Sequence, residues 1–231
     1  MRNMDHRSDQ RVHEERAAII LAGGQSSRFG SNKALQDLAG KPLIRHVVER
    51  VSNVAGEVVV VIGRSESKTM YSKLLPSAVK IVNDDLEGKN PLIGFVSGLT
   101  ATESDYAAIL ACDVPFVSGE VVDLLFRRGS NADAAIPRWS RQRIEPLQAV
   151  YRRISALTAA SEALVPADLS LEDMIRKLQR VVYVPVEDEI AIIDCGLATF
   201  FNINTSEDMK AAERMLAEKS LSGVQSGVER S

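Results

Sequence analysis

The chain has 231 residues, long enough for one α/β domain with a sizeable core. Its formal net charge of −3 and the scarcity of basic clusters argue against nucleic acid as the main partner. No apolar run approaches the roughly 20 residues needed to span a bilayer, so no membrane partner is expected. Two cysteines, Cys112 and Cys195, stand far apart in no metal-like spacing. This usage is typical of a reducing, cytoplasmic location and not of a disulfide scaffold.

The first predicted strand covers the apolar residues 17–21. Residues 1–16, which precede it, are polar and charged, with no apolar segment that could serve as a secretory signal, and we interpret them as a flexible extension.

A glycine-rich loop follows this strand, and residues 21–33, LAGGQSSRFGSNK, are named here the phosphate loop. The adjacent Gly23 and Gly24 let the backbone turn sharply and approach a ligand without an intervening Cβ. Exposed backbone N–H groups followed by the cations Arg28 and Lys33 are suited to holding polyphosphate. The alternative is an ordinary surface turn with solvated charges.

The phosphate loop differs from two better-known nucleotide loops. It lacks the Gly-Lys-Ser/Thr ending of a Walker A sequence, and its adjacent glycines do not fit the G-x-G-x-x-G spacing. The next strand ends in Gly63-Arg64 and lacks the acidic residue expected of a dinucleotide-binding fold. A dehydrogenase is therefore disfavoured.

Strand and helix patterns alternate along the rest of the chain. Leu43, Val47, Val51 and Val54 recur at helical spacing, which predicts a helix over residues 43–54. The valine-rich residues 58–62 predict a strand buried on both faces, as in a parallel sheet covered by helices. Further strands are expected at 79–82, 106–111, 134–137, 144–151 and 181–186, and further helices at 67–75, 91–100, 119–128, 154–164, 171–178 and 207–217. This order predicts an α/β fold with a doubly wound, mostly parallel sheet.

Asp113 follows the predicted strand 106–111 directly. An aspartate at the carboxyl end of a central parallel strand lies at the crevice where open α/β sheets bind ligands. A carboxylate there can hold Mg²⁺, which prefers a few oxygen ligands together with substrate phosphates. Asp113 is therefore the candidate metal ligand.

Two polar stretches lie in the second half of the chain. Residues 138–143 contain Arg138, Arg141 and Arg143, which could bind an anionic substrate that accepts a transferred group, or could form a solvated loop. In the extended residues Asn202-Ile203-Asn204, alternation points both amides to the same face. These amides either contact a substrate or tie the loop to neighbouring backbone.

Four segments carry a family resemblance. The phosphate loop resembles the signature L-A-G/A-G-x-S-x-R-x-G-x-x-K of nucleotidyltransferases with a Rossmann-like fold. Residues 91–94 (PLIG), 112–116 (CDVPF) and 200–208 (FFNINTSED) resemble motifs of the molybdenum cofactor guanylyltransferases, the MobA-like family, and occur in the family's order. Asn90 replaces a family glycine, and Ser206 replaces a family proline.

The resemblance implies transfer of GMP from GTP to the terminal phosphate of the molybdenum-bearing molybdopterin, with release of pyrophosphate and with Mg²⁺ as cofactor. It implies a single domain over residues 17–219, with a nucleotide half at about 17–130 and an acceptor half at about 131–219, before a disordered tail at 220–231. Proteins that deliver molybdopterin or receive the product are candidate partners.

The resemblance also implies the site residues. Asp84 or Asp85 is the equivalent of a family acid, and its carboxylate could accept the paired N1–H and N2–H₂ donors of guanine; the alternative is a solvated acidic turn. The catalytic residues are Arg28, Lys33 and Asp113, the last also binding the metal, and the acceptor-binding residues are Asn202, Asn204 and Arg143. The nucleotide-binding residues are Leu21, Ala22, Gly23, Gly24, Ser26, Ser27, Lys33, Asp84 and Asp85.

Two alternatives remain open at this point. A related nucleotidyltransferase could use the same loop with another NTP or another phosphorylated acceptor. A nucleotide-sensing module without enzymatic activity is the alternative of a different class. Pyrophosphate release across several nucleotides, with molybdenum cofactor as acceptor, separates these functions.

Overall fold

The computed structural model describes residues 15–23, 32–84, 91–163 and 170–228. Most of the predicted N-terminal extension lies outside these residues. Arg16 is already part of the first strand, and its guanidinium pairs with Asp123 at 2.8 Å.

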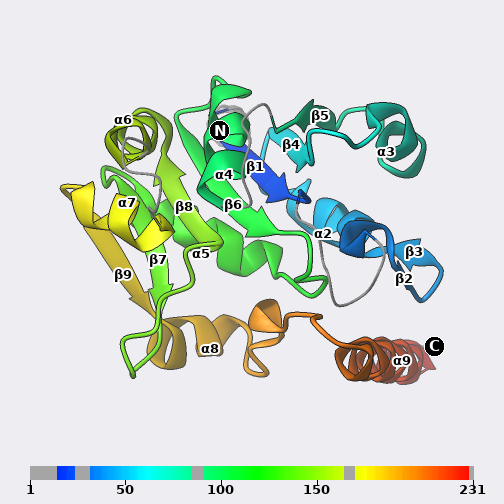
Figure 1. The fold of residues 1–231 in the computed structure, drawn as a ribbon. Helices are drawn as coiled ribbons and strands as arrows, with labels where there is room; N and C mark the ends of the chain where they lie inside the picture. The colour runs from blue at the N-terminus through cyan, green and yellow to red at the C-terminus, as the bar shows by residue number, and fades with distance from the viewer. Residues whose placement is uncertain (1–14, 24–31, 85–90, 164–169, 229–231) are drawn as a thin grey trace, which may run out of the picture.

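A seven-stranded sheet forms the centre of the fold, in the order β5-β4-β1-β6-β8-β7-β9 (Figure 1). Strand β8 runs antiparallel to its neighbours β6 and β7, and every other neighbouring pair is parallel. The strands are β1 Arg16–Leu21, β4 Glu57–Ile62, β5 Lys80–Asn83, β6 Tyr106–Ala111, β7 Ala134–Arg138, β8 Gln148–Arg152 and β9 Val181–Pro185. The prediction of a doubly wound, mostly parallel sheet is confirmed. The antiparallel strand follows from its connection, because β7 and β8 are joined without the crossover helix that a parallel pair needs.

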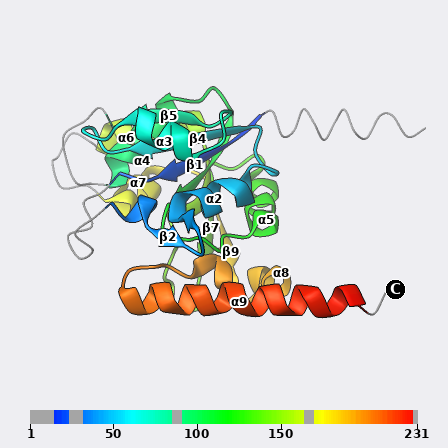
Figure 2. The same cartoon turned by 90° about the vertical axis from the view of Figure 1, so that its right-hand side faces the viewer.

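Helices cover both faces of the sheet (Figures 1 and 2). Side chains of α2, α3 and α5 pack on one face, and those of α4, α6 and α7 pack on the other. Alternate residues of β1 serve the two cores, since Ala18 and Ile20 face one and Ala17 and Ile19 face the other. The helices are α2 Leu43–Val51, α3 Lys68–Leu74, α4 Pro91–Thr100, α5 Gly119–Gly129, α6 Arg153–Ala163, α7 Leu171–Lys177, α8 Ala191–Ile193 and α9 Ser206–Val228.

Shorter elements complete the architecture. The hairpin strands are β2 Asp37–Leu38 and β3 Lys41–Pro42, and the short helical turns are η1 Lys33–Leu35, η2 Val186–Ile190 and η3 Ala198–Phe200. A third apolar cluster holds α9 against the rest of the molecule, where Ala212 meets Leu38, Leu43 and Ile203. Helix α9 lies along one side of the domain, apart from the two layers that cover the sheet (Figure 2).

Gly98 sets how closely α4 approaches the sheet. A Cβ at this position would lie 2.3 Å from Cγ2 of Ile19 and 3.1 Å from Cγ2 of Val61. The missing side chain therefore lets α4 lie directly on β1 and β4.

Three predicted boundaries differ from the structure by more than one residue. Helix α2 ends at Val51 and not at residue 54, because the Ser52 hydroxyl bonds the Val48 carbonyl (2.7 Å) and the chain turns. Strand β8 begins at Gln148 and not at residue 144, since Pro146 has no N–H to donate to a ladder.

The third difference concerns the C-terminus. Helix α9 continues to Val228, through residues 220–228 for which the sequence predicts disorder. Extending an existing helix needs no new nucleus, and each of the two glycines within it, Gly223 and Gly227, costs only about 1 kcal/mol.

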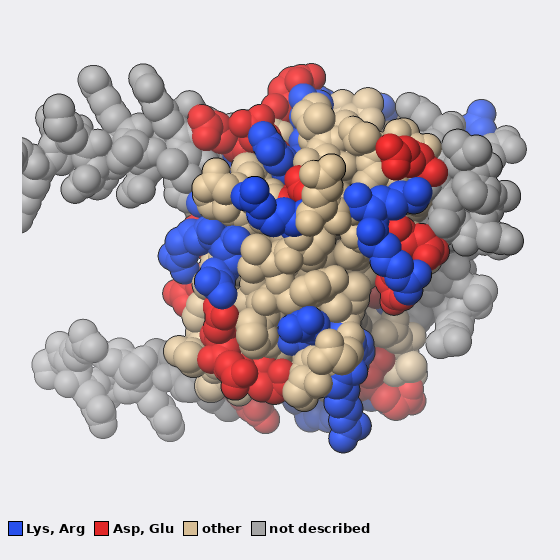
Figure 3. Space-filling view, turned by 90° about the vertical axis from the view of Figure 1, so that its left-hand side faces the viewer, with Lys and Arg blue, Asp and Glu red and all other residues tan. Residues whose placement is uncertain are grey.

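Strand β9 forms one edge of the sheet. The face on that side carries Lys and Arg interspersed with Asp and Glu around a strip of uncharged residues (Figure 3). Among the helices in the described part of the chain, none is both long and apolar enough to cross a membrane.

Candidate active site

The carboxyl ends of four parallel strands bring the predicted site residues to one edge of the sheet. Strands β1, β4, β5 and β6 are adjacent and point the same way. Gly23, Gly63, Asp84 and Asp113 follow these strands within one or two residues. The crevice beyond such strand ends is where open α/β sheets bind ligands.

Lys33 and Asp113, both predicted to be catalytic, are in direct contact. The Lys33 ammonium lies 2.7 Å from Oδ2 of Asp113 and 2.8 Å from Oδ1 of Asn204. The two ionic side chains are only 14% and 20% exposed, so water screens their attraction less than it would at the surface. The structure thus joins one cation, one carboxylate and one amide from three distant parts of the sequence.

Backbone contacts hold each of these three residues. Asn32 caps η1 by accepting a hydrogen bond from Ala34 N (3.0 Å), and this turn carries Lys33. The N–H of Ile203 donates to the carbonyl of Asp113 at 2.9 Å, which fixes the segment containing Asn204 beside β6.

Asp208, in the first turn of α9, holds the other end of that segment. Its Oδ2 accepts from the N–H groups of Asn204 and Thr205, both at 2.8 Å. Hydrogen bonds from Asn204 and then from Thr205 keep the pKa of Asp208 below its ordinary value. The Thr205 hydroxyl in turn accepts from Asp208 N, so Thr205 caps the start of α9.

Asp113 has the features of a magnesium ligand. While Oδ2 holds Lys33, Oδ1 is buried and has no hydrogen-bond partner among the described residues. The described residues contain no cluster of three His, Cys, Asp or Glu side chains that could hold a metal. A single carboxylate with one unpaired oxygen fits Mg²⁺, which keeps several waters and takes phosphates as further ligands.

Cys112, beside Asp113, is buried within the core. Burial, with the nearby Asp113 charge as the second cause, raises the pKa of the Cys112 thiol to about 12. The thiol therefore stays protonated at neutral pH and is a poor nucleophile.

Asp84 packs against α4. Its N–H donates to the Ile62 carbonyl at 2.9 Å, and its Oδ1 accepts from the Ser97 hydroxyl at 3.0 Å. A Cβ added to Gly94 would lie 3.7 Å from Oδ2 of Asp84. Asp84 is thus a half-buried carboxylate that α4 orients, whereas Asp85 lies outside the described residues.

Only part of the phosphate loop is described. Leu21 ends β1, and the N–H groups of Ala22 and Gly23 both donate to the Val61 carbonyl (2.8 and 3.1 Å). These two N–H groups therefore extend the hydrogen bonding between β1 and β4 beyond the end of β1. The predicted site residues Gly24, Ser26, Ser27 and Arg28 lie outside the described residues.

The predicted acceptor residues lie on two adjoining segments. Arg143 pairs with Glu145 at 3.0 Å, and its guanidinium lies over the Trp139 ring, 4.6 Å from the centroid. Trp139 packs against Phe200, with centroids 5.3 Å apart, which joins the β7–β8 connection to the segment before Asn202. The Asn202 amide donates to the Phe200 carbonyl at 3.1 Å, and both Asn202 and Asn204 are exposed.

Sequence reasoning missed the role of three polar residues: Asn32 near the end of the phosphate loop, and Glu66 and Tyr71 beside it. Hydrogen bonds connect the side chains of all three. Glu66 lies in the polar sequence Ser-Glu-Ser-Lys and resembles a solvated turn residue, so the local sequence carries no signal for this contact.

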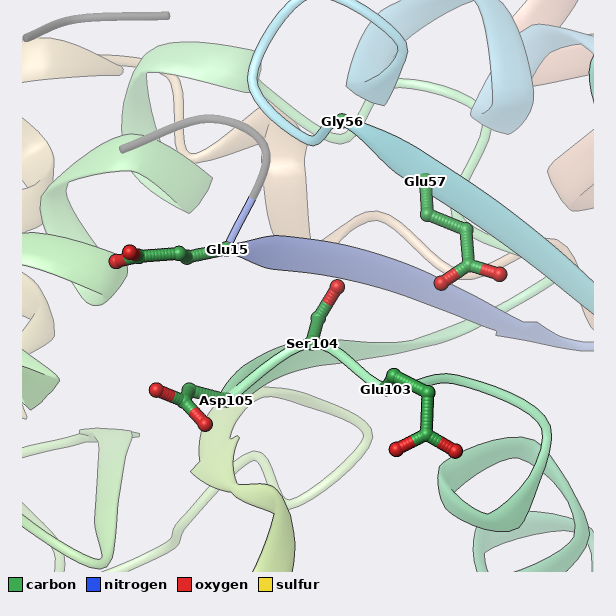
Figure 4. A pocket seen from close by; sticks show the side chains of 6 residues that line it. All are labelled: Glu15, Gly56, Glu57, Glu103, Ser104 and Asp105. Carbon is green, nitrogen blue, oxygen red and sulfur yellow. The ribbon is translucent and has the colours of Figure 1, made fainter. Parts of the chain in front are cut away.

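A pocket at the opposite edge of the sheet is separate from this site (Figure 4). It lies at the amino ends of β1, β4 and β6 and is lined by Glu15, Gly56, Glu57, Glu103, Ser104 and Asp105. Two of its carboxylates are already paired, Glu57 with the Thr102 hydroxyl and Glu103 with Arg153.

Known proteins resemble this chain over most of its length. The sequence model described as MobA-like NTP transferase domain matches residues 18–181. A probable molybdenum cofactor guanylyltransferase of Natronomonas pharaonis is 33% identical, covering 88% of this chain and 99% of that protein. One from Methanosarcina acetivorans is 37% identical, covering 86% and 90%.

A solved structure is similar as well. The crystal structure of molybdopterin-guanine dinucleotide biosynthesis protein A from Archaeoglobus fulgidus superimposes with a TM-score of 0.74 at 31% identity, covering 87% of this chain and 99% of that one. Because the family model matches most of the chain and these relatives are more than 30% identical over most of their length, the chain belongs to the MobA-like NTP transferase family.

Proposed function

We propose that the protein transfers GMP from GTP to the terminal phosphate of molybdenum-bearing molybdopterin. An oxygen of the acceptor phosphate attacks the α-phosphorus of GTP, the bond from that phosphorus to the bridging oxygen of the β-phosphate breaks, and pyrophosphate leaves. The names of relatives that match most of this chain support the reaction. The contact of Lys33 with Asp113 and Asn204 at the carboxyl edge of the sheet is the observation that carries the proposal.

Catalysis in this proposal rests on positioning and charge neutralisation. An acceptor phosphate is already anionic at neutral pH, so the reaction needs no general base. Lys33 donates to the triphosphate and counters the charge that develops on the leaving pyrophosphate. Arg28 and the polar groups of the phosphate loop, including Gly24, Ser26 and Ser27, are assigned to the same triphosphate from the sequence pattern.

Asp113 is the proposed ligand for Mg²⁺ through its buried Oδ1, which has no partner among the described residues. When bound, Mg²⁺ would neutralise negative charge on the phosphates. Oδ2 keeps its own hydrogen bond to Lys33, so the two oxygens of Asp113 serve different cations.

Asp113→Asn tests this assignment, because it keeps the shape of the side chain and removes its charge. Its Mg²⁺-dependent pyrophosphate release should collapse while the far-UV circular dichroism spectrum stays native. The same half-saturating Mg²⁺ concentration and rate as wild type would refute the assignment.

The acceptor is assigned to the second half of the chain. Arg143 presents an exposed guanidinium beside Trp139, and Asn202 and Asn204 present exposed amides from the adjoining segment. An amide offers both donors and an acceptor, which suits a pterin edge and a phosphate. If Asn202 contacts the acceptor, Asn202→Ala should raise the KM for molybdopterin without changing the affinity for GTP. A normal acceptor KM together with reduced stability would show that Asn202 only ties its own loop.

A nucleotide panel tests the choice of substrate. With molybdenum-bearing molybdopterin present, pyrophosphate release should be fast with GTP and slow with ATP, CTP and UTP. Preference for another nucleotide, or release only with a different phosphorylated acceptor, would favour a related nucleotidyltransferase. Nucleotide binding without pyrophosphate release under all conditions would favour a sensing module.

A further inference from the structure

A group of hydrogen-bonded residues at the end of the phosphate loop has no role in the reaction assigned above. The Glu66 carboxylate accepts at one oxygen from Gly63 N (2.7 Å) and from the Tyr71 hydroxyl (3.3 Å). Its other oxygen accepts from the Asn32 amide, which also donates to the Tyr71 hydroxyl at 2.7 Å. Asn32, Gly63, Glu66 and Tyr71 are named here the Glu66 network.

Asn83 and the burial of Tyr71 hold the Glu66 network in place. Asn83, the last residue of β5, donates its side-chain amide to the carbonyls of Gly63 and Glu66, both at 3.0 Å. Tyr71 is fully buried, and burial, with the Glu66 charge as the next cause, raises the pKa of its hydroxyl strongly. The Tyr71 hydroxyl therefore remains a hydrogen-bond donor at any physiological pH.

Asn32 links this network to the catalytic lysine. Its amide nitrogen is bound by Glu66 and Tyr71, while its oxygen accepts from Ala34 N and caps the turn η1. The residue between Asn32 and Ala34 is Lys33, whose ammonium lies between Asp113 and Asn204. The backbone that carries Lys33 is thus fixed through the Asn32 side chain.

The network also supports the start of the phosphate loop. A Cβ on Gly23 would lie 3.1 Å from Gly63 N, the same N–H that donates to Glu66. Gly23 therefore lies close against the Glu66 network, and Asn32, on the other side of residues 24–31, is part of it.

We propose that Glu66 and Tyr71 are positioning residues, which act through Asn32 to place the Lys33 ammonium on the triphosphate. The proposal rests on the function proposed above for Lys33. A carboxylate suits this role because it only accepts hydrogen bonds, and here three donors converge on it. A glutamine of the same size would turn an N–H₂ group toward at least one of those donors.

A double-mutant cycle tests the proposal, since coupling between two residues appears as non-additivity. Glu66→Gln and Tyr71→Phe are made in the wild-type chain and in Lys33→Met. For each protein, kcat/KM for pyrophosphate release, the Kd for GTP and the melting temperature are measured. Glu49→Gln is the matched control, because Glu49 pairs with Lys41 and Arg45 on the surface, away from the network.

Misplacing a catalytic group by about 1 Å can cost up to roughly a hundredfold in rate, so Glu66→Gln should lower kcat/KM by about tenfold in the wild-type chain. In the Lys33→Met background it should lower kcat/KM less than about twofold, because the group it positions is gone. The fall in melting temperature should be equal in both backgrounds. Tyr71→Phe should show the same coupling with a smaller effect, and Glu49→Gln should match wild type.

Equal losses of kcat/KM in the two backgrounds would overturn the proposal, because Glu66 would then act independently of Lys33. If Glu66→Gln does not fold, Tyr71→Phe decides by the same comparison. A wild-type protein that binds GTP but releases no pyrophosphate would refute the proposed function alone. The cycle would then compare how each substitution changes the Kd for GTP in the wild-type and Lys33→Met backgrounds. Equal changes would overturn the positioning role, and a smaller change in the Lys33→Met background would support it.

Discussion

Removing the Lys33 ammonium should damage both stability and activity, and Lys33→Met is the cleanest change because it keeps most of the side-chain volume. The ammonium makes two charge-assisted hydrogen bonds, at 2.7 and 2.8 Å, from a side chain that is 14% exposed. Such bonds are worth about 1.5–3 kcal/mol each, and rehydration of Asp113 and Asn204 recovers part of the loss. We therefore expect the free energy of unfolding to fall by about 2 kcal/mol.

The loss of activity should be larger than this loss of stability implies. An electrostatic donor to a developing charge contributes about 3 kcal/mol, so kcat/KM should fall roughly a hundredfold under conditions where the variant is fully folded. Urea denaturation measures the first effect and pyrophosphate release the second.

Lys41→Met is the matched control for this experiment. Lys41 pairs with Glu49 at 2.8 Å, but its side chain is 47% exposed, so its loss should cost less than about 1 kcal/mol and leave kcat/KM unchanged. A Lys33→Met protein with wild-type stability and wild-type kcat/KM would refute the role assigned to this contact.

Three further predictions follow from packing, hydrogen bonding and base selection. Gly98→Ala should lower the free energy of unfolding by about 1–3 kcal/mol because its Cβ would lie 2.3 Å from a β1 side chain, whereas Gly196→Ala, with open space around it, should not. The stabilisation that Asp208 gains by accepting from Asn204 N is complete above the ordinary aspartate pKa of about 3.9 and is lost as pH falls through its lowered pKa. Unfolding of Asp208→Asn should accordingly depend less on pH below about pH 4, and parallel wild-type and variant curves would contradict this. If the Asp84 carboxylate accepts the paired donors of guanine, Asp84→Asn should reduce the preference for GTP over ATP in kcat/KM by about ten- to a hundredfold, and an unchanged ratio would locate base recognition elsewhere.

That Lys33 and Asp113 serve one site could be anticipated from the sequence, because Asp113 directly follows β6 and Lys33 ends the loop that follows β1. Adjacent parallel strands bring the segments that follow them to the same edge of the sheet. The apolar runs 17–21 and 106–111 were long enough to identify those strands.

The Glu66 network could not be anticipated in this way. Asn32 and Glu66 are 34 positions apart, and their contact depends on the conformation of two polar loops that periodicity does not describe. The predicted start of β8 was wrong for a related reason, because Pro146 interrupts a stretch whose other residues favour a strand.

Asn204 lies between these two cases. Alternation predicts that Asn202 and Asn204 share one face, and both residues are exposed, but only the fold shows that Asn204 accepts from Lys33. That contact requires α9 and its preceding segment to return to the carboxyl edge of the sheet, which no local pattern encodes.

The most direct test of the proposed activity is identification of the product. The purified protein is incubated with GTP, Mg²⁺ and molybdenum-bearing molybdopterin, and the products are analysed by mass spectrometry alongside a pyrophosphate assay. The account predicts a molybdopterin whose terminal phosphate carries GMP, formed in equal amount to the pyrophosphate released and formed far more slowly when Lys33→Met replaces the wild-type protein. Pyrophosphate without the guanine dinucleotide, or the dinucleotide formed equally well by Lys33→Met, would contradict it.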